Sequence, residues 1–173
     1  MKTLKIIITI LISIITANAC SQCHHAIKVE TGYLYFIDHT ITIDSDNPDW
    51  KGYKLNDQQN GVDFNIINGI RFREHYMAGI GLGYLNFEGI HGSAMFADLE
   101  YAPLKRKISP VFSIKAGYNH IWNQYEKGSG SALGEIGAGI KYKANKKLSF
   151  HIQAGISRTQ QAQFFPVRLG FSF

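Results

Sequence analysis

The last residues of the chain alternate strictly between two kinds of side chain. Every second residue from Phe165 to the final Phe173 is apolar, and the residues between them are Pro166, Arg168, Gly170 and Ser172. A period of two is that of a β-strand, whose successive side chains point to opposite faces. Pro166 is tolerated if it lies near the start of the strand. The pattern therefore predicts a terminal strand with one apolar face and an aromatic last residue.

The N-terminal segment 1–19 has the features of a secretory signal peptide. Lys2 and Lys5 precede an apolar run over 6–15, and the small-residue sequence Ala17-Asn18-Ala19 follows. The run is shorter than the roughly 18 residues that a membrane helix needs, and no longer apolar run follows it. We expect cleavage before Cys20, so any membrane crossing must be made by strands.

Eight segments with period-two alternation lie between turn signals. They are 26–36, 62–73, 75–87, 92–102, 108–122, 131–143, 146–157 and 164–173. Eight strands make the smallest closed membrane barrel. Connections are short near Glu74, Lys105 and Ala144 and longer at 37–61, 123–130 and 158–163, while the link at 88–91 is short although the strand order places it outside. Because such barrels have short periplasmic turns and long external loops, we expect both termini in the periplasm.

One face of these segments is aliphatic and uncharged, with aromatic residues at both of its ends. Those toward the long loops are Tyr33, Tyr35, Phe64, Tyr84, Tyr118, Trp122 and Phe165, and those toward the short turns are Phe72, Tyr76, Tyr101, Tyr142, Phe150, Phe171 and Phe173. Two aromatic girdles around an aliphatic belt are typical of a membrane barrel. The alternative, a soluble sandwich, gives aromatic residues no reason to separate by height. Asn68 interrupts the belt without explanation.

The opposite face is polar and carries both signs of charge. We assign an internal ion-pair network to Glu30, Arg71, Asp98, Glu100, Lys115, Glu135, Lys141, His151 and Arg168, and place Lys28, Asp63, Arg73 and Gln153 on the same face. A lone buried charge costs several kcal/mol, so near-equal numbers of both signs favour pairing. The lumen of eight strands is just wide enough for side chains to fill. The prediction is an all-β, eight-stranded, antiparallel up-and-down transmembrane barrel over 26–173, with a polar, plugged lumen and a short stub at 20–25.

This pattern resembles the small OmpA/OmpX-type outer-membrane barrels, in particular the family of short bacterial "outer membrane protein beta-barrel domain" chains. The resemblance is carried by the signal peptide, by the glycine-rich strands MAGIGLGY and EIGAGIKY, and by the terminal LGFSF. That ending, with Phe171 and Phe173, is similar to the signal read by the barrel assembly machinery. The resemblance implies a bacterial outer-membrane location, with outer-membrane lipid and the assembly machinery as partners. It does not supply a specific function.

Cys20, Cys23 and His24 match the C-x-x-C-H spacing of covalent haem attachment. The motif adjoins the cleavage site and has no helical domain around it, which argues against haem. A lipid-modified Cys20 is a second interpretation, although Ala17 and Asn18 match a lipobox poorly, and we favour the third, a periplasmic Cys20–Cys23 disulfide or a pair without a role. We expect neither a cofactor nor a metal site.

His91 and Ser93 lie two residues apart on the aliphatic face, near the long loops. A His and Ser so placed resemble the lipid A deacylase barrels, in which the pair and an acid activate a serine nucleophile. Glu88 falls in a turn and Asp98 faces inward, so no carboxylate is placed to complete the set. We predict no enzymatic activity and keep the deacylase as the alternative function.

The segment 37–61 is long, acidic and contains Trp50 and Tyr53. Long exposed loops on a rigid scaffold carry binding, so this segment is the candidate surface for an extracellular ligand. Without Lys2 and Lys5 the formal charge falls from +5 to +3, a balance that does not indicate nucleic-acid binding. The sequence thus predicts a surface-interaction barrel of the outer membrane.

Overall fold

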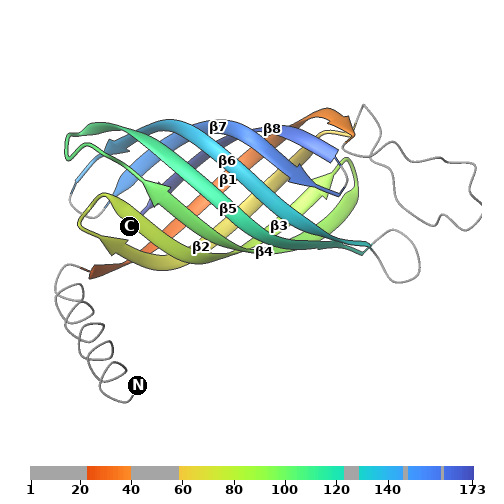
Figure 1. The fold of residues 1–173 in the computed structure, drawn as a ribbon, viewed down its shortest axis with the longest axis horizontal. Coiled ribbons are helices and arrows are strands. Elements are labelled where there is room, and N and C mark those ends of the chain that lie inside the picture. Colours follow the sequence, from red (N-terminus) through yellow and green to blue (C-terminus); the bar gives the residue numbers. More distant parts are fainter. Residues whose placement is uncertain (1–22, 40–58, 123–128, 146–147, 161) are drawn as a thin grey trace, which may run out of the picture.

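A computed structural model describes residues 23–39, 59–122, 129–145, 148–160 and 162–173, and eight strands in it close into a barrel (Figure 1). The strands are β1 (Cys23–His39), β2 (Gly61–Phe72), β3 (Tyr76–Phe87), β4 (Ile90–Tyr101), β5 (Ile108–Ile121), β6 (Ser129–Lys143), β7 (Ser149–Thr159) and β8 (Ala162–Ser172). Each pairs antiparallel with its neighbours in sequence, and β1 pairs with β8. The predicted fold and strand number are confirmed. The described residues contain no helix long and apolar enough to cross a membrane, which does not bear on crossing by strands.

The two ends of the barrel differ in their connections. One end, the turn end, holds the start of β1, the end of β8 and the connections at 73–75, 102–107 and 144–148 (Figure 1). The other, the loop end, holds the strand ends that are joined through 40–60, 88–89, 122–128 and 160–161, so the long connection expected at 158–163 is wrong because β7 continues to Thr159 and β8 begins at Ala162. Glu88 (φ 52°) and Gly89 (φ 96°) explain the short β3–β4 connection there, because two positive φ angles form a two-residue type I′ hairpin turn.

The strand β1 begins at Cys23 rather than at residue 26. Cys23 lies opposite Phe72 and His25 lies opposite Ile70, so the β1–β2 ladder extends through residues that we had assigned to a stub. His25 Nε2 is also 2.6 Å from Asn68 Oδ1, a side-chain hydrogen bond that ties the first residues of β1 to β2. The stub prediction is therefore wrong for Cys23–His25.

Pro166 lies inside β8 rather than near its start. The β7–β8 ladder pairs Ala154 with Val167 and resumes at Ser157 with Phe164, leaving a gap opposite the proline. Proline has no N–H to donate to a ladder, which accounts for the gap. On its other side β8 stays in register with β1, where Leu34 faces Pro166.

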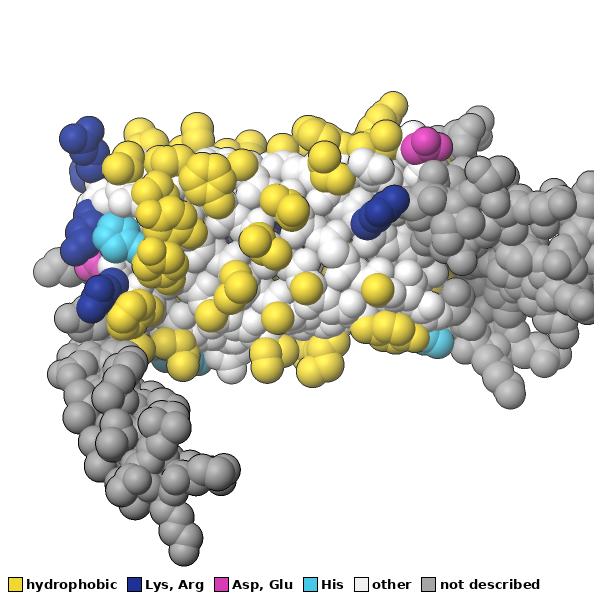
Figure 2. Space-filling view, in the orientation of Figure 1, with side chains coloured by type: hydrophobic (Ala, Val, Ile, Leu, Met, Phe, Trp, Pro, Cys, Tyr) yellow, Lys and Arg dark blue, Asp and Glu magenta, His cyan; other side chains and the backbone are white. Residues whose placement is uncertain are grey.

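The outer wall of the barrel is apolar. Ile80 is 60% exposed and Ile136 is 68% exposed, and the aromatic residues predicted for the two girdles occupy outward positions of the alternation. Figure 2 shows large apolar side chains in a band beside the turn end, with basic side chains gathered beyond it. An exposed surface of this composition is suited to lipid rather than to water.

Ile80→Arg tests the assignment of the outer wall. Ile80 faces outward in the body of β3, so an arginine there should lower the free energy of unfolding by about 2–4 kcal/mol. The matched variant Ile108→Arg changes an outward residue at the first position of β5, where the cost should be about 0–1 kcal/mol. Urea unfolding in lipid vesicles measures both. Equal costs at the two positions would contradict the assignment.

Candidate functional site: the filled lumen

Inward-facing side chains form two layers inside the barrel. A charged layer contains Lys28, Glu30, Asp63, Asp98, Glu100, Lys115, Glu135, Lys141, His151 and Arg168, all buried. An apolar plug occupies the loop end and contains Leu34, Phe36, Leu85, Phe87, Ile90, Ala94, Phe96, Ile121, Ala162 and Phe164, also buried. The interior is therefore closed by two different kinds of contact.

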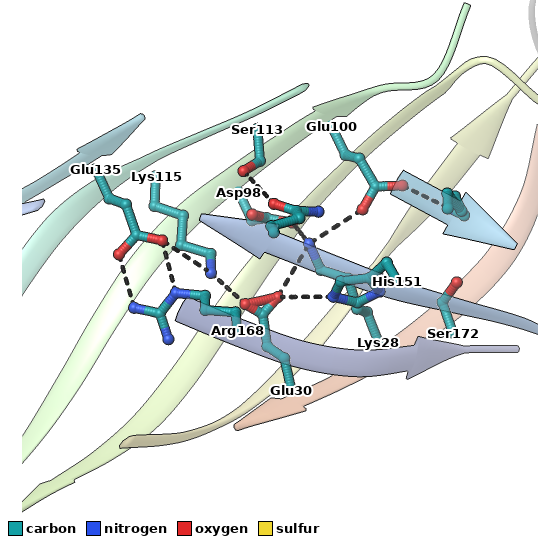
Figure 3. A network of polar contacts seen from close by, with 12 residues as sticks. Lys28, Glu30, Asp98, Glu100, Ser113, Lys115, Glu135, His151, Arg168 and Ser172 are labelled. Carbon is teal, nitrogen blue, oxygen red and sulfur yellow. Dashed lines mark hydrogen bonds and ion pairs between the residues drawn. The ribbon is translucent and has the colours of Figure 1, made fainter. Parts of the chain in front are cut away.

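Lys28 holds one half of the charged layer together (Figure 3). Its Nζ lies 2.6 Å from Asp98 Oδ2, 3.2 Å from Glu30 Oε1 and 3.3 Å from Glu100 Oε2. Lys141 Nζ donates to the other oxygen of Glu100. Three carboxylates from two strands thus share the charge of a fully buried ammonium group.

Arg168 holds the other half. Its Nε and Nη2 each donate to one oxygen of Glu135 at 2.6 Å, a two-pronged contact, while Nη1 donates to Asp63 Oδ1 at 2.5 Å. The planar guanidinium can satisfy two carboxylates at once because its five donors form a fixed fork. Figure 3 shows the Lys115 ammonium between the halves, where it donates to Glu30 and lies 3.5 Å from Glu135.

The structure brings most of the residues predicted for the network into one connected set. Arg71 is the exception, because its Nη2 donates to Ser172 Oγ at 2.8 Å near the turn end. His151 lies at the edge of the set, with Nε2 3.8 Å from Glu30 Oε1. Arg73, which we placed on the inner face, is exposed in a turn and lies over the Phe72 ring, so that placement is wrong.

Two residues outside the predicted network make central contacts. Lys28 and Asp63 had the inward parity but were not assigned to the network, and they bind Asp98 and Arg168 respectively. Their inward position in the strand alternation was the signal that could have identified them. It could not show which charges meet, because contact across a lumen depends on the stagger between distant strands.

The apolar plug is built around Phe164. Its ring lies 5.3 Å from the Phe87 ring and 6.0 Å from the Phe36 ring between centroids, the second in an edge-to-face arrangement. Between plug and charged layer remains a cavity of about 10 Å³, comparable to a single water-sized probe. The alternation of the sequence predicted a polar inner face throughout and missed this layer, although Leu34, Phe36, Leu85 and Phe87 lie at inward positions of that alternation.

Two polar pairs interrupt the outer wall. Asn68 Oδ1 accepts a hydrogen bond from His25 Nε2, which accounts for the residue that the belt pattern left unexplained. Near the loop end, Tyr84 Oη lies 2.5 Å from His91 Nδ1. Ser93 faces Tyr84 on β3 and His120 on β5, so its direct cross-strand neighbours supply no carboxylate.

Several predicted positions lie outside the described residues. These are the signal peptide 1–19, Cys20 with its three interpretations, and the loop residues Trp50 and Tyr53. Among the residues that are described, no group of three or more His, Cys, Asp or Glu side chains could hold a metal ion.

Comparison with known proteins locates the fold. No protein-family model and no curated protein sequence matches the chain. Neisserial surface protein A matches with a TM-score of 0.62 and 8% identity, over 87% of this chain and 97% of that one. The N-terminal β-barrel domain of Pseudomonas aeruginosa OprF matches with a TM-score of 0.55 and 14% identity, over 88% and 100%. The fold is that of a small bacterial outer-membrane barrel. Identities this low show the fold alone, so function must be argued from the residues of this chain.

Lys28→Met tests the charged layer. Removing the ammonium leaves Asp98, Glu30 and Glu100 crowded without their shared partner, and we expect a loss of about 3–5 kcal/mol in the free energy of unfolding. Adding Asp98→Asn should recover part of that loss, because it removes the carboxylate with the shortest contact to Lys28. Lys107→Met, at an exposed turn position, should change stability by less than about 0.5 kcal/mol. Urea titration in vesicles measures these losses. Equal losses in the free energy of unfolding for the two lysine variants would contradict the expectation.

Proposed function

We propose that this protein is a closed outer-membrane barrel that anchors an interaction surface at the cell exterior and carries out no chemical step. The filled lumen is the observation that carries the proposal. The charged layer joins opposite sides of the barrel, and the plug seals its loop end. A barrel closed in this way serves as a scaffold for what its ends present.

The proposed orientation places the loop end outside the cell. Small outer-membrane barrels have short periplasmic turns and longer external loops, and the turn end of this barrel carries the connections at 73–75, 102–107 and 144–148. The longest connection, which includes Trp50 and Tyr53, would then face the exterior. An extracellular ligand would bind through this segment, 37–61.

The proposed partners follow from the same orientation. Outer-membrane lipid would surround the apolar wall. The barrel assembly machinery would read the C-terminal residues Phe171 and Phe173, whose rings stack with centroids 6.1 Å apart on the outer face. This pair is supported as a recognition element by its exposure, since neither ring contributes to the buried interior.

The deacylase alternative receives less support. His91 and Ser93 do lie near each other on the outer wall, but His91 Nδ1 is engaged with a tyrosine hydroxyl. An acyl-transfer triad needs a carboxylate that orients the histidine, and the cross-strand neighbours of Ser93 are Tyr84 and His120. The proposed function therefore includes no catalysis at this pair.

Planar-bilayer recording tests closure of the barrel. We expect no stable single-channel steps from the folded protein, because plug and charged layer leave a cavity of only about 10 Å³ between them. An open porin reconstituted in the same way is the positive control. Persistent steps whose size scales with salt concentration would contradict a closed barrel and favour a channel.

Protease treatment of intact cells tests the orientation. A protease site placed within 40–58 should be cut on intact cells, and the same site placed in the turn at Lys105–Lys107 should be cut only after the outer membrane is permeabilised. Immunoblotting of the fragments reports both results. The reverse pattern would show that the loop end faces the periplasm.

A further inference from the structure

A groove of about 860 Å³ opens on the outer wall over β5, β6 and β7. Its volume is in the range of sites that bind small ligands. Small outward residues line the bottom of the groove, and larger apolar side chains border it. The small residues are Ala116, Gly134, Ala138 and Ala154, and the larger ones are Phe112, Ile114, Ile136 and Ile156. A Cβ atom built on Gly134 would meet nothing within 4 Å, so the groove is open at this point.

Arg158 lines the loop-side part of this groove. It is the next-to-last residue of β7, faces outward and is exposed, directly across from Gly134 on β6 and Gln163 on β8. Within the described residues its guanidinium makes no hydrogen bond or ion pair. The described outward positions of β5, β6 and β7 also contain no Asp or Glu. A cation that faces lipid without a protein partner marks a candidate ligand site.

The guanidinium, rather than the groove alone, must select the occupant. Apolar surface gives no hydrophobic preference in a bilayer, because lipid tails are as apolar as the groove. An arginine, by contrast, binds a phosphate through charge-assisted hydrogen bonds that gain strength where water is scarce. The combination calls for an amphiphile with a phosphate at the loop end and an acyl chain that runs along the groove toward Ala138 and Ala154.

A second copy of this chain fits the same face poorly. A symmetric contact centred on the groove would bring two Arg158 side chains together, with no carboxylate on the described outward positions of β5–β7 to neutralise them. Like charges brought together in a contact of low dielectric constant are unfavourable. The charge at the groove therefore favours an anionic lipid.

We propose that this groove binds one molecule of lipid A, with a phosphate on Arg158 and an acyl chain between the isoleucines of β5, β6 and β7. The choice of lipid A over other anionic lipids rests on the proposed orientation, which places the loop end in the outer leaflet. Gln163 lies beside Arg158 and can add a donor from its amide to the same phosphate.

Native mass spectrometry of the full mature chain, folded in detergent and incubated with defined lipids, tests the proposal. The probes are lipid A, its dephosphorylated form, phosphatidylglycerol and phosphatidylcholine. We expect retention of one lipid A molecule, a loss of about tenfold in affinity in Arg158→Gln, and near wild-type affinity in Arg158→Lys.

Gly134→Leu fills the groove without a backbone clash and should weaken the binding of lipid A and of its dephosphorylated form alike. Ala78→Leu, on β3 away from the groove, is the matched control and should change nothing.

Four results would overturn the proposal. They are equal retention of lipid A and its dephosphorylated form, unchanged affinity in Arg158→Gln, preference for phosphatidylglycerol, and a dimer mass that Gly134→Leu abolishes. A heat-dependent band shift on gel electrophoresis confirms that each variant is folded. Failure of the lipid site leaves the bilayer recordings and the protease pattern unchanged, so it is distinguishable from failure of the proposed function.

Discussion

The narrow interior of an eight-stranded barrel is the constraint on which the rest of this structure depends. Inward side chains at this radius must fill the space completely and satisfy one another, because almost no room remains for water. Lys28 and Arg168 meet the requirement by placing one cation among several carboxylates drawn from different strands. The pairs Lys28–Asp98, Lys115–Glu30 and Arg168–Asp63 also join strands that are not neighbours in the sheet. The charges close the lumen and cross-link the wall at the same time.

Glycine makes this filling geometrically feasible. A Cβ atom at Gly32 would lie 2.6 Å from Asp63 Oδ1 and 2.7 Å from Arg168 Nη1, within the space that their contact uses. At Gly81 it would lie 2.4 Å from the Phe96 ring, which takes part in the plug. Large side chains on some strands are accommodated by glycine on others. The glycine-rich strands of the sequence are thus the counterpart of the large charged and aromatic side chains.

Alternation in the sequence predicted the eight strands, their order and the charged character of the middle of the lumen, since a period of two is a local property. It missed the plug around Phe164 because both faces of the strands are apolar near the loop end, where alternation carries no contrast. It left Asn68 unexplained because the partner, His25, was placed outside the barrel. It did not separate Arg71 from the network, since contact across the lumen depends on stagger rather than on parity. The missing information was non-local for Asn68 and Arg71, whereas the plug was missed for a local reason.

The outer wall is apolar, and the few polar residues that interrupt it are informative. A polar side chain that faces lipid is expected to find a partner, and the pairs His25–Asn68 and Tyr84–His91 do so within the sheet. Arg158 has no such partner among the described residues, and the wall beside it is hollow rather than packed. Lysines of the lumen are neutralised by carboxylates of the same chain, whereas the described outward residues around Arg158 offer none. Charges inside the barrel are neutralised within the chain, whereas the charge of Arg158 on the described part of the outer wall is not. A phosphate from the surrounding membrane would neutralise it.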